Sequence, residues 1–437
     1  MLAGAVVGDN SDITSIYFNP AGISQIEDQK FVLNANLFKL KYESYDGYMG
    51  ENTSSEDWGF RVQPRFVSYT YRSKKINKLS YQVAVFNRNS ENKSIYAQEK
   101  VLSNYYQKEG TEQTISNYDY TSDYNDYWGG LGLSYQFNEK LSVGVSLLAS
   151  IKTFSYDKNL FVMVLNYENK TIGDSYLFNF ESYERIMLYD VRALAKVGVK
   201  YKIKQWALGL NITVPSVHVL GNSDVKRKIN YVNYENEEGV SESGIANEFS
   251  QYRAAKIKDP LSLAFGFVYY SKNLKSQYYF STEYFHAIET YLVVDGKQSV
   301  YADEYPEGTD FSSYKFGTKS ITNFAIGYKR ILSKNFDIVM GAKTDFNAYL
   351  VSNEGVFEGI NEMDKVHNNL YHITIGSNFN VKKASFVLGF ENSFGQLNNT
   401  ESLMRVNGFN IIPMDKEGKM NYFTYSIGMF LGFTLDF

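Results

Sequence analysis

The C-terminal stretch, residues 423–437, alternates strictly between large apolar residues and mostly small or polar ones. Phe, Tyr, Ile, Met or Leu occupies every second position from Phe423 to Phe437, and Thr, Ser, Gly or Asp fills nearly all positions between them. Because successive side chains of a β-strand point to opposite faces, this stretch predicts a strand with one wholly apolar face. Such a face must contact either a second sheet or lipid.

Four further stretches alternate in the same way, at 141–151, 206–214, 261–269 and 384–390. Runs of ~10 residues match a tilted transmembrane strand and exceed the ~5 to 6 residues of an ordinary strand. The mean hydropathy is -0.34, and no window of the sequence approaches the ~18 apolar residues of a membrane helix. The sequence therefore excludes a helical membrane protein, and the strand lengths favour a membrane β-barrel.

The connections between these strands alternate between short and long. The short ones fall near 73–78, 138–140, 203–205, 272–275, 332–335 and 380–383, and the long polar ones at about 43–58, 91–126, 156–186, 218–258, 292–318, 351–367 and 396–421. Six short turns and seven long loops separate fourteen strands, and an even count with short turns on one rim is the layout of a bacterial outer-membrane barrel. We therefore predict an all-β membrane protein: a 14-stranded antiparallel transmembrane β-barrel over residues 29–437 with long extracellular loops.

Charge follows the same division. Lysine is concentrated in the short turns, as in SKKINK at 73–78, whereas the long segments at 292–318 and 351–367 are acidic. The formal net charge of the whole chain is -4, which gives no reason to expect a nucleic-acid partner, because a protein that binds a duplex needs a basic face.

Signals for catalysis are weak. The chain has no cysteine, which removes disulfides, thiol catalysis and thiolate metal sites, and its four histidines show no metal-binding spacing. No GxSxG motif or phosphate-binding glycine loop is present. We expect no enzyme activity, cofactor or metal; the alternative is a barrel hydrolase built from Ser, His and acidic residues on adjacent strands.

The segment before the first strand has a different character. Asn19 is a preferred helix N-cap, Pro20 suits the first helical position, and Ala21 continues into one short helical turn. A fourteen-stranded barrel encloses more space than its own side chains fill. Residues 1–28 are therefore predicted to form a small N-terminal hatch inside the lumen.

Together, the sequence Ser-Ile-Tyr-Phe-Asn-Pro-Ala-Gly at 15–22, the fourteen predicted strands and the terminal Phe437 resemble the FadL-type outer-membrane transporters of hydrophobic compounds. The resemblance implies that the segment carrying Asn19, Pro20 and Ala21 is a hatch. It also implies that long-chain fatty acids or aromatic hydrocarbons bind in the lumen and leave laterally or past the hatch. It covers the whole chain in layout, and only about residues 3–24 in local sequence.

Alternation also assigns charged residues to the inner face, because a Lys or Arg facing lipid at mid-membrane costs ~2 to 4 kcal/mol. The predicted inward set is Arg61, Arg65, Asp190, Arg192, Lys196, Lys200, Lys343, Asp345 and Glu391. One interpretation is that a cation of this set binds a ligand carboxylate. The other is that the cations pair with Asp190, Asp345, Glu391 and acidic hatch residues, and so hold the hatch in place.

Two prolines, Pro64 and Pro215, lie inside predicted strands. A proline removes a ladder hydrogen bond, so each marks a bulge, a kink or a strand end. Such a break is a candidate lateral exit for an apolar ligand, and the alternative is a local bend near the rim.

These observations predict a barrel in the bacterial outer membrane that takes up hydrophobic small molecules such as long-chain fatty acids. Its expected partners are outer-membrane lipids and a hydrophobic ligand. The alternative is a FadL-like barrel that does not transport and serves as an accessory subunit of a larger outer-membrane assembly, for protein export or barrel insertion, with other outer-membrane proteins as partners.

Overall fold

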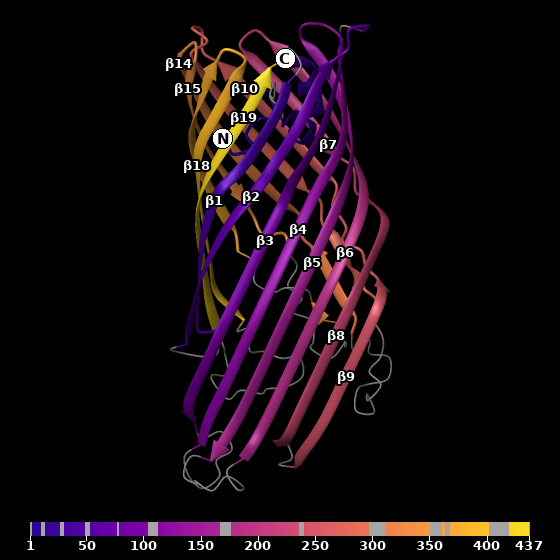
Figure 1. The fold of residues 1–437 in the computed structure, drawn as a ribbon, viewed down its shortest axis with the longest axis vertical. Helices are drawn as coiled ribbons and strands as arrows, with labels where there is room; N and C mark the ends of the chain where they lie inside the picture. Colours follow the sequence, from indigo (N-terminus) through magenta and orange to yellow (C-terminus); the bar gives the residue numbers. More distant parts are fainter. Residues whose placement is uncertain are drawn as a thin grey trace.

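The chain forms a closed antiparallel β-barrel around a short N-terminal segment (Figure 1). The computed structural model describes residues 2–9, 14–26, 30–48, 53–76, 78–103, 112–166, 176–235, 240–296, 312–349, 361–362, 368–401 and 419–436. Its elements are α1 (Ser15–Phe18), the 3-10 helix η1 (Pro20–Gln25), β1 (Lys30–Asp46), β2 (Ser54–Arg72), β3 (Leu79–Ser103), β4 (Glu112–Gln136), β5 (Leu141–Asn166), β6 (Tyr176–Ile203), β7 (Trp206–Thr213), β8 (Val217–Glu235), β9 (Ser241–Ala254), β10 (Ser262–Tyr270), β11 (Ser276–Phe285), β12 (Ile288–Val294), β13 (Tyr314–Thr318), β14 (Ile321–Ser333), β15 (Phe336–Asp345), β16 (Asn361–Glu362), β17 (Leu370–Val381), β18 (Ala384–Glu401) and β19 (Lys419–Asp436).

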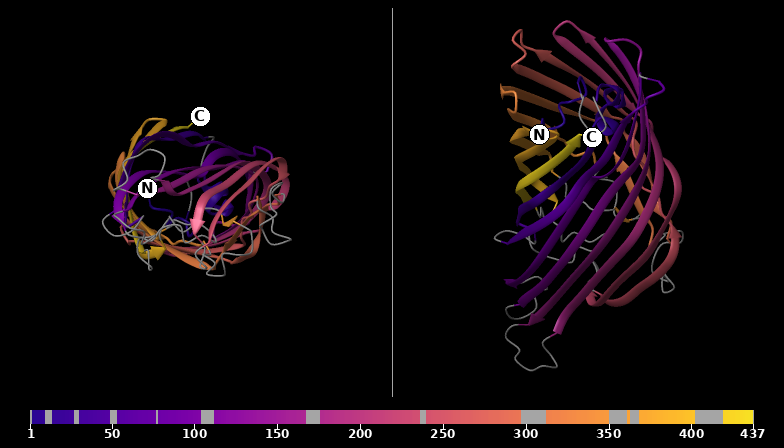
Figure 2. Two further views of the ribbon diagram at one scale, coloured as in Figure 1. Left: turned by 90° about the horizontal axis from the view of Figure 1, so that it is seen from below. Right: turned by 45° about the horizontal axis from the view of Figure 1, so that its top comes forward.

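The barrel has fourteen wall strands, as the sequence predicts. Neighbours pair in the order β1-β2-β3-β4-β5-β6-β7-β10-β11-β14-β15-β17-β18-β19, and β19 closes the ring on β1. β8 pairs with β6 directly beyond β7, and β9 pairs with β8 before the chain continues into β10. Each of these two wall strands is therefore a pair of segments with a break between them. The ring is visible from below in the left panel of Figure 2.

The outer surface of the wall is apolar around the barrel. Leu147 of β5 is 63% exposed and Ile326 of β14 is 58% exposed, whereas Ser146 and Ser150 on the inner side of β5 are fully buried. An apolar outside and a polar inside is the pattern of a transmembrane barrel. Among the described residues, no helix is both long and apolar enough to span a membrane.

The long connections predicted at 91–126, 156–186 and 218–258 are wrong, because most of these residues continue the strands. β6 alone has 28 residues, against the ~9 to 11 that cross a bilayer. β3, β4, β5, β6, β8 and β9 extend together past the others as a tall wall on one side, as Figure 1 shows. The sequence of these extensions is similar to that of loops because the residues of their outer face are polar. The residues of their inner face are apolar, so the alternation typical of a strand continues.

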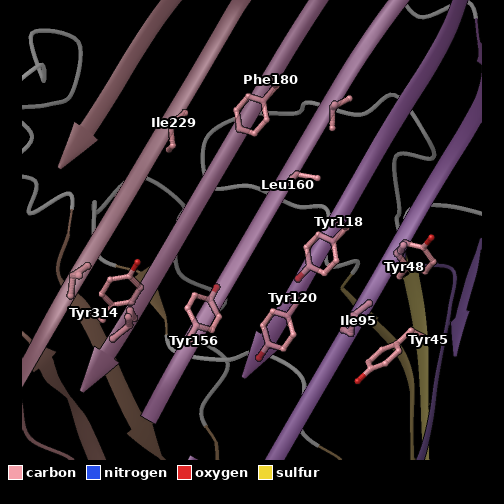
Figure 3. Packing of buried hydrophobic residues seen from close by; sticks show 14 of the residues in the cluster. Tyr45, Tyr48, Ile95, Tyr118, Tyr120, Tyr156, Leu160, Phe180, Ile229 and Tyr314 are labelled. Atoms are coloured by element: carbon pink, nitrogen blue, oxygen red, sulfur yellow. The ribbon is translucent and has the colours of Figure 1, made fainter. Parts of the chain in front are cut away.

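The inner face of this tall wall carries a second apolar layer, here called the extracellular core. Leu160 and Val162 of β5 and Phe180 of β6 are fully buried in it. Figure 3 shows side chains of this layer on one face of the strands. Tyr314 of β13 packs there too, and burial beside the Glu184 carboxylate raises its pKa well above the usual value. Its phenol therefore stays neutral at physiological pH, and it adds no charge to this core.

The N-terminal segment, defined as residues 2–9 and 14–26, packs against the inner wall near the short-turn end of the barrel (Figure 2, right). Asn19 caps η1, since its side chain accepts a hydrogen bond from the Ala21 N–H at 3.1 Å. Its amide also donates to the Val7 carbonyl at 2.9 Å and to the Val199 carbonyl of β6 at 3.2 Å. Asn19 thus joins both parts of the segment to the wall.

Serines and glycines of the wall allow this close packing. The hydroxyls of Ser134 and Ser142 donate to the Ala21 carbonyl at 3.1 and 3.0 Å. A Cβ at Gly209 would lie 1.8 Å from the Val7 carbonyl oxygen, and one at Gly144 would lie 2.3 Å from the Pro20 backbone. Glycine is required at both positions because the backbone of the segment touches the backbone of the wall.

The substitution Gly209→Ala should displace residues 2–9 and leave the barrel folded. The added methyl group overlaps Val7, so the Val7 N–H, which donates to Ser281 Oγ at 3.2 Å, should exchange with deuterium at least tenfold faster. Hydrogen exchange followed by mass spectrometry measures this. Gly59→Ala is the control, because its new methyl group would meet only Lys41 Cβ at an ordinary 3.8 Å. Unchanged exchange in the Gly209 variant would contradict the packing.

Candidate functional site: the lumen and the slit between β2 and β3

The wall is open along part of one strand pair. β2 and β3 pair only from Phe66↔Phe86 to Arg72↔Ser80. Residues of β2 before Phe66 stay paired with β1, and residues of β3 after Phe86 stay paired with β4. In the described structure, residues 54–65 of β2 and 87–103 of β3 therefore share no ladder pair, and we call this stretch the slit.

Two residues explain why the pairing stops there. Extending the β2–β3 register by two residues places Pro64 opposite Arg88. Proline has no N–H to donate to the ladder. Arg88 is the extra residue of a β-bulge, since Asn87 pairs with Tyr127 and Asn89 with Asp126. A bulge bends its strand, so β3 leaves β2 at the point where β2 lacks a donor. Pro64 is thus at the start of the slit.

Side chains connect the two edges of the slit. Arg61 of β2 forms an ion pair with Asp123 of β4 at 3.1 Å and also hydrogen-bonds Ser90 of β3. Lys41 of β1 donates to the Asn92 carbonyl at 2.9 Å, and Ser55 donates to the Tyr96 carbonyl at 3.3 Å. The slit is therefore closed by side chains where the rest of the wall is closed by backbone hydrogen bonds.

These contacts also show that the two edges overlap. Arg61 alternates with Phe60 and Val62, which are 66% and 65% exposed on the outside of β2, so Arg61 belongs to the inward set of β2. Asp123 belongs to the outward set of β4, because Asp126 and other even-numbered neighbours are buried inside. The inner side of β2 therefore covers the outer side of the β3–β4 edge. Arg61, expected in the lumen, instead lies in this seam.

An aromatic cluster lies at the base of the slit, inside the barrel. Phe66 and Phe86, the last paired residues of β2 and β3, stack at 5.4 Å between ring centroids. Tyr17 of α1 lies 5.5 Å from Phe86 and 5.7 Å from Trp128 of β4. The ammonium group of Lys196 lies 4.6 Å from the Tyr17 ring centroid. The guanidinium group of Arg88 lies 4.8 Å from the Trp128 ring centroid. The cluster is thus apolar with two cations against its rings, and it includes a side chain of the N-terminal segment.

On the side of the aromatic cluster that faces the extracellular core lies a buried ionic network. It consists of Arg88, Asp126, Lys152, Asp259, Arg192 and Asp190. Lys152 joins Asp126 at 2.9 Å and Asp259 at 2.8 Å, and all three side chains are almost completely buried. Asp126 also accepts from the Trp128 indole at 2.9 Å and from the Ser150 hydroxyl at 2.6 Å. The network separates the polar lumen from the extracellular core.

The other end of the network fastens the second break in the wall. Residues 214–216 separate β7 from β8, and Pro215 lies among them. Arg192 donates to the Ser216 hydroxyl at 2.5 Å and carbonyl at 2.8 Å, and pairs with Asp190 at 3.1 Å. The Asp259 N–H in turn donates to the Ser216 hydroxyl at 3.0 Å. The kink at Pro215 is thus held by hydrogen bonds and an ion pair.

A third group of charges faces the lumen from β1, β2, β15 and β18. Lys39, Arg65 and Lys343 surround the carboxylate of Glu391, and Arg65 forms an ion pair with it at 3.6 Å. We call these three the lumen cations. His372 contacts Glu391 at 3.3 Å and Ser393 Oγ at 2.6 Å, and its Nε2 has no hydrogen-bond partner in the described part of the chain. Three cations thus share one partly buried carboxylate.

The predicted inner-face residues therefore separate into five places. Arg61 lies in the seam of the slit, Lys196 in the aromatic cluster, Asp190 and Arg192 in the ionic network, and Arg65, Lys343 and Glu391 at the lumen cations. Lys200 pairs with Asp9 of the N-terminal segment, and Asp345 lies 3.9 Å from His372 Nε2. The roles of these residues in ligand binding or in holding the N-terminal segment stay predictions.

Most residues of the ionic network were not predicted from the sequence. Asp126 was assigned to the expected loop 91–126, and Asp259 came directly after another expected loop. Two signals were available. Arg88 continues the even-numbered inward series of Gln82, Ala84 and Phe86, and Lys152 continues the inward series of Ser146 and Ser150 at the same spacing.

Removing one carboxylate from the network should be costly. Asp126→Asn leaves Lys152 and Arg88 short of a partner in a buried site, so the free energy of unfolding should fall by about 3 to 5 kcal/mol. Urea unfolding of the protein in lipid bilayers measures this. Asp123→Asn is the matched control. The Asp123 side chain is 39% exposed, so its ion pair with Arg61 should contribute at most about 1 kcal/mol to the free energy of unfolding. Equal losses in both variants would contradict the distinction.

Comparison with known proteins supports the fold. No protein-family model and no curated protein sequence matches the chain. Its fold is similar to a Pseudomonas aeruginosa FadL homologue, with 11% identity, a TM-score of 0.57, and coverage of 100% of this chain and 96% of the homologue. It is also similar to the Pseudomonas putida toluene transporter TodX (13% identity, TM-score 0.56, 98% and 95% covered) and to the Ralstonia pickettii toluene transporter TbuX (12%, 0.53, 98% and 94%). With its apolar outer belt and its closed ring of fourteen strands, the chain has the fold of these FadL-type barrels.

Proposed function

We propose that this protein takes up hydrophobic small molecules across the outer membrane and releases them sideways through the slit. The observation that carries this proposal is the position of the aromatic cluster at the base of the slit. Phe66 and Phe86 belong both to the cluster and to the last ladder pair before the wall opens. An apolar molecule held by these rings would therefore have a direct path from the lumen to the hydrocarbon of the bilayer.

The free energy for this path comes from apolar burial. Transfer of a chain from water into an apolar site yields ~0.8 kcal/mol per CH₂ group. Aromatic rings supply apolar surface at the base of the slit, and the outer side of the slit is flanked by exposed Phe60 and Val62, which face lipid. The ligand would therefore exchange one apolar environment for another, without a large barrier from rehydration.

The N-terminal segment acts in this proposal as the hatch. Its packing through Asn19, Ala21 and Gly209 fills the lumen near the short-turn end, where water-soluble solutes would otherwise pass. Tyr17 of the same segment belongs to the aromatic cluster. Ligand binding at the cluster and the position of the hatch would therefore be linked through one side chain.

The lumen cations support a ligand with a carboxylate, such as a long-chain fatty acid. Lys39, Arg65 and Lys343 exceed the charge of Glu391, so a second anion would be favourable beside them. Arg192 is a poorer candidate, because Asp190 and Ser216 already occupy its guanidinium group. Aromatic hydrocarbons, the cargo named for TodX and TbuX, are the neutral alternative. The alternative role as an accessory subunit gains no support from these neighbours.

Locking the slit should abolish lateral release. In Arg61→Cys/Ser90→Cys, a bis-methanethiosulfonate reagent with the span of an arginine side chain would tether the edges, and the natural chain has no cysteine that could react. Uptake of labelled oleate and of toluene by intact Gram-negative cells that lack their own transporter should fall at least tenfold, and reduction should restore it. Thr121→Cys/Asp157→Cys joins ladder partners of β4 and β5 and should have no effect. Full uptake by the tethered protein would rule out release through the slit.

The ligand class is tested by removing one lumen cation. Lys343→Gln should weaken oleate binding about fivefold to twentyfold, because it removes one charge-assisted contact, and should leave binding of oleyl alcohol unchanged. Isothermal titration calorimetry in detergent micelles measures both. Lys226→Gln, on the outside of the tall wall, is the control. An equal effect on the acid and the alcohol would show that Lys343 does not contact a carboxylate, while lateral uptake through the slit would still stand.

A further inference from the structure

The six short turns carry a charge opposite to that of the rest of the chain. Residues 73–78, 137–140, 202–205, 271–275, 332–335 and 381–383 contain eleven lysines and one acidic residue, Glu139. The whole chain has a formal net charge of -4. The positive charge is therefore concentrated at one end of the barrel, and none of the contacts proposed for uptake uses it.

Each of these turns also exposes a large apolar side chain next to its lysines. The six residues are Ile76, Phe137, Ile203, Leu274, Leu332 and Val381, and they are between 45% and 62% exposed. Phe137, Ile203 and Val381 continue the outward, lipid-facing series of β4, β6 and β17. An apolar residue beside a lysine is the combination that suits the boundary between hydrocarbon and head groups, where the apolar part is buried and the ammonium group reaches out.

The turns are also distributed around the whole circumference. They join β2 to β3, β4 to β5, β6 to β7, β10 to β11, β14 to β15 and β17 to β18, and all lie at the upper end of the barrel in Figure 1. A protein partner would contact one side of such a rim. A lipid leaflet surrounds it, so a repeated motif in every turn fits lipid better than a single docked protein.

We propose that this ring of turns binds the head groups of anionic phospholipids in the periplasmic leaflet of the outer membrane. The short turns of outer-membrane barrels lie on the periplasmic side. Lysines near an anionic membrane surface each add attraction that decays within a Debye length. The apolar residue of each turn enters the edge of the hydrocarbon, and the neighbouring lysines contact phosphate. The ring thereby fixes the height of the barrel in the membrane and recruits anionic lipid around it.

Fluorescence quenching by brominated lipids tests this in reconstituted bilayers of the full chain. Trp206 is the natural probe, because it follows the turn 202–205, is 43% exposed, and pairs with Tyr269 beside the turn 271–275. Trp58→Phe removes the tryptophan exposed at the other end, and Trp128 is buried. Brominated phosphatidylglycerol should quench Trp206 at a lower mole fraction than brominated phosphatidylcholine, with at least threefold preferential binding. The preference should disappear in 0.5 M salt, where the Debye length is roughly 4 Å.

Two matched triple variants locate the charge that matters. Lys204→Gln/Lys272→Gln/Lys275→Gln should reduce the preference for phosphatidylglycerol to near unity. Lys226→Gln/Lys256→Gln/Lys319→Gln removes the same charge from exposed positions near the other end of the chain's strands and should preserve the preference. Equal quenching by the two lipids in the natural chain would overturn the proposal. The ring of lysines would then be a candidate site for a soluble acidic partner. An equal loss in both triple variants would also overturn the proposal, because long-range charge alone would then explain the effect.

Discussion

The structure depends on one constraint: in hydrocarbon, every backbone N–H and C=O must find a partner within the protein. A closed ring of strands satisfies this constraint everywhere except where a residue cannot donate or the register is interrupted. Pro64 and the Arg88 bulge supply both conditions at one place, and the wall opens there. The freed carbonyls of β3 are not left alone, since Lys41 and Ser55 donate to those of Asn92 and Tyr96. In the slit, side-chain hydrogen bonds thus replace the backbone hydrogen bonds of the ladder.

The second organising feature is a reversal of polarity along the strands. In β5, Leu147 faces lipid while Ser146 and Ser150 face the lumen. Beyond Lys152 the same inner series becomes Phe154, Tyr156 and Leu160, and the outer side is polar from Thr153 to Asn159. The even-numbered residues of β5 face inward along the whole strand, but the surroundings of the strand change from membrane to water. Inside the membrane the protein must be polar inward, and outside the membrane it must be apolar inward. The ionic network around Asp126 and Lys152 lies at this change, where buried charges need partners on every side.

Much of this architecture could be predicted from the sequence. The period-two patterns at 141–151 and 423–437 and the short lysine-rich turns gave the barrel and its fourteen strands. The extensions of β3 to β9 could not be read in the same way, because an exposed polar face with aromatic residues between resembles a loop as much as a strand. The contacts of Arg61 with Ser90 and Asp123 were beyond reach for a different reason. They depend on the bulge at Arg88 and on the overlap of two strand edges, which arise from pairing between strands far apart in the chain.

The Arg88 bulge has an effect on everything that follows it in β3. Before it, the buried residues are the even-numbered Gln82, Ala84 and Phe86; after it, they are the odd-numbered Lys93, Ile95 and Ala97. The extra residue sets which side chains of β3 face inward after it. A strand shorter by this single residue would turn the apolar side chains after position 88 out to water and the polar ones into the extracellular core. Natural selection must therefore first preserve the presence of an extra residue at position 88, and only then the type of its side chain.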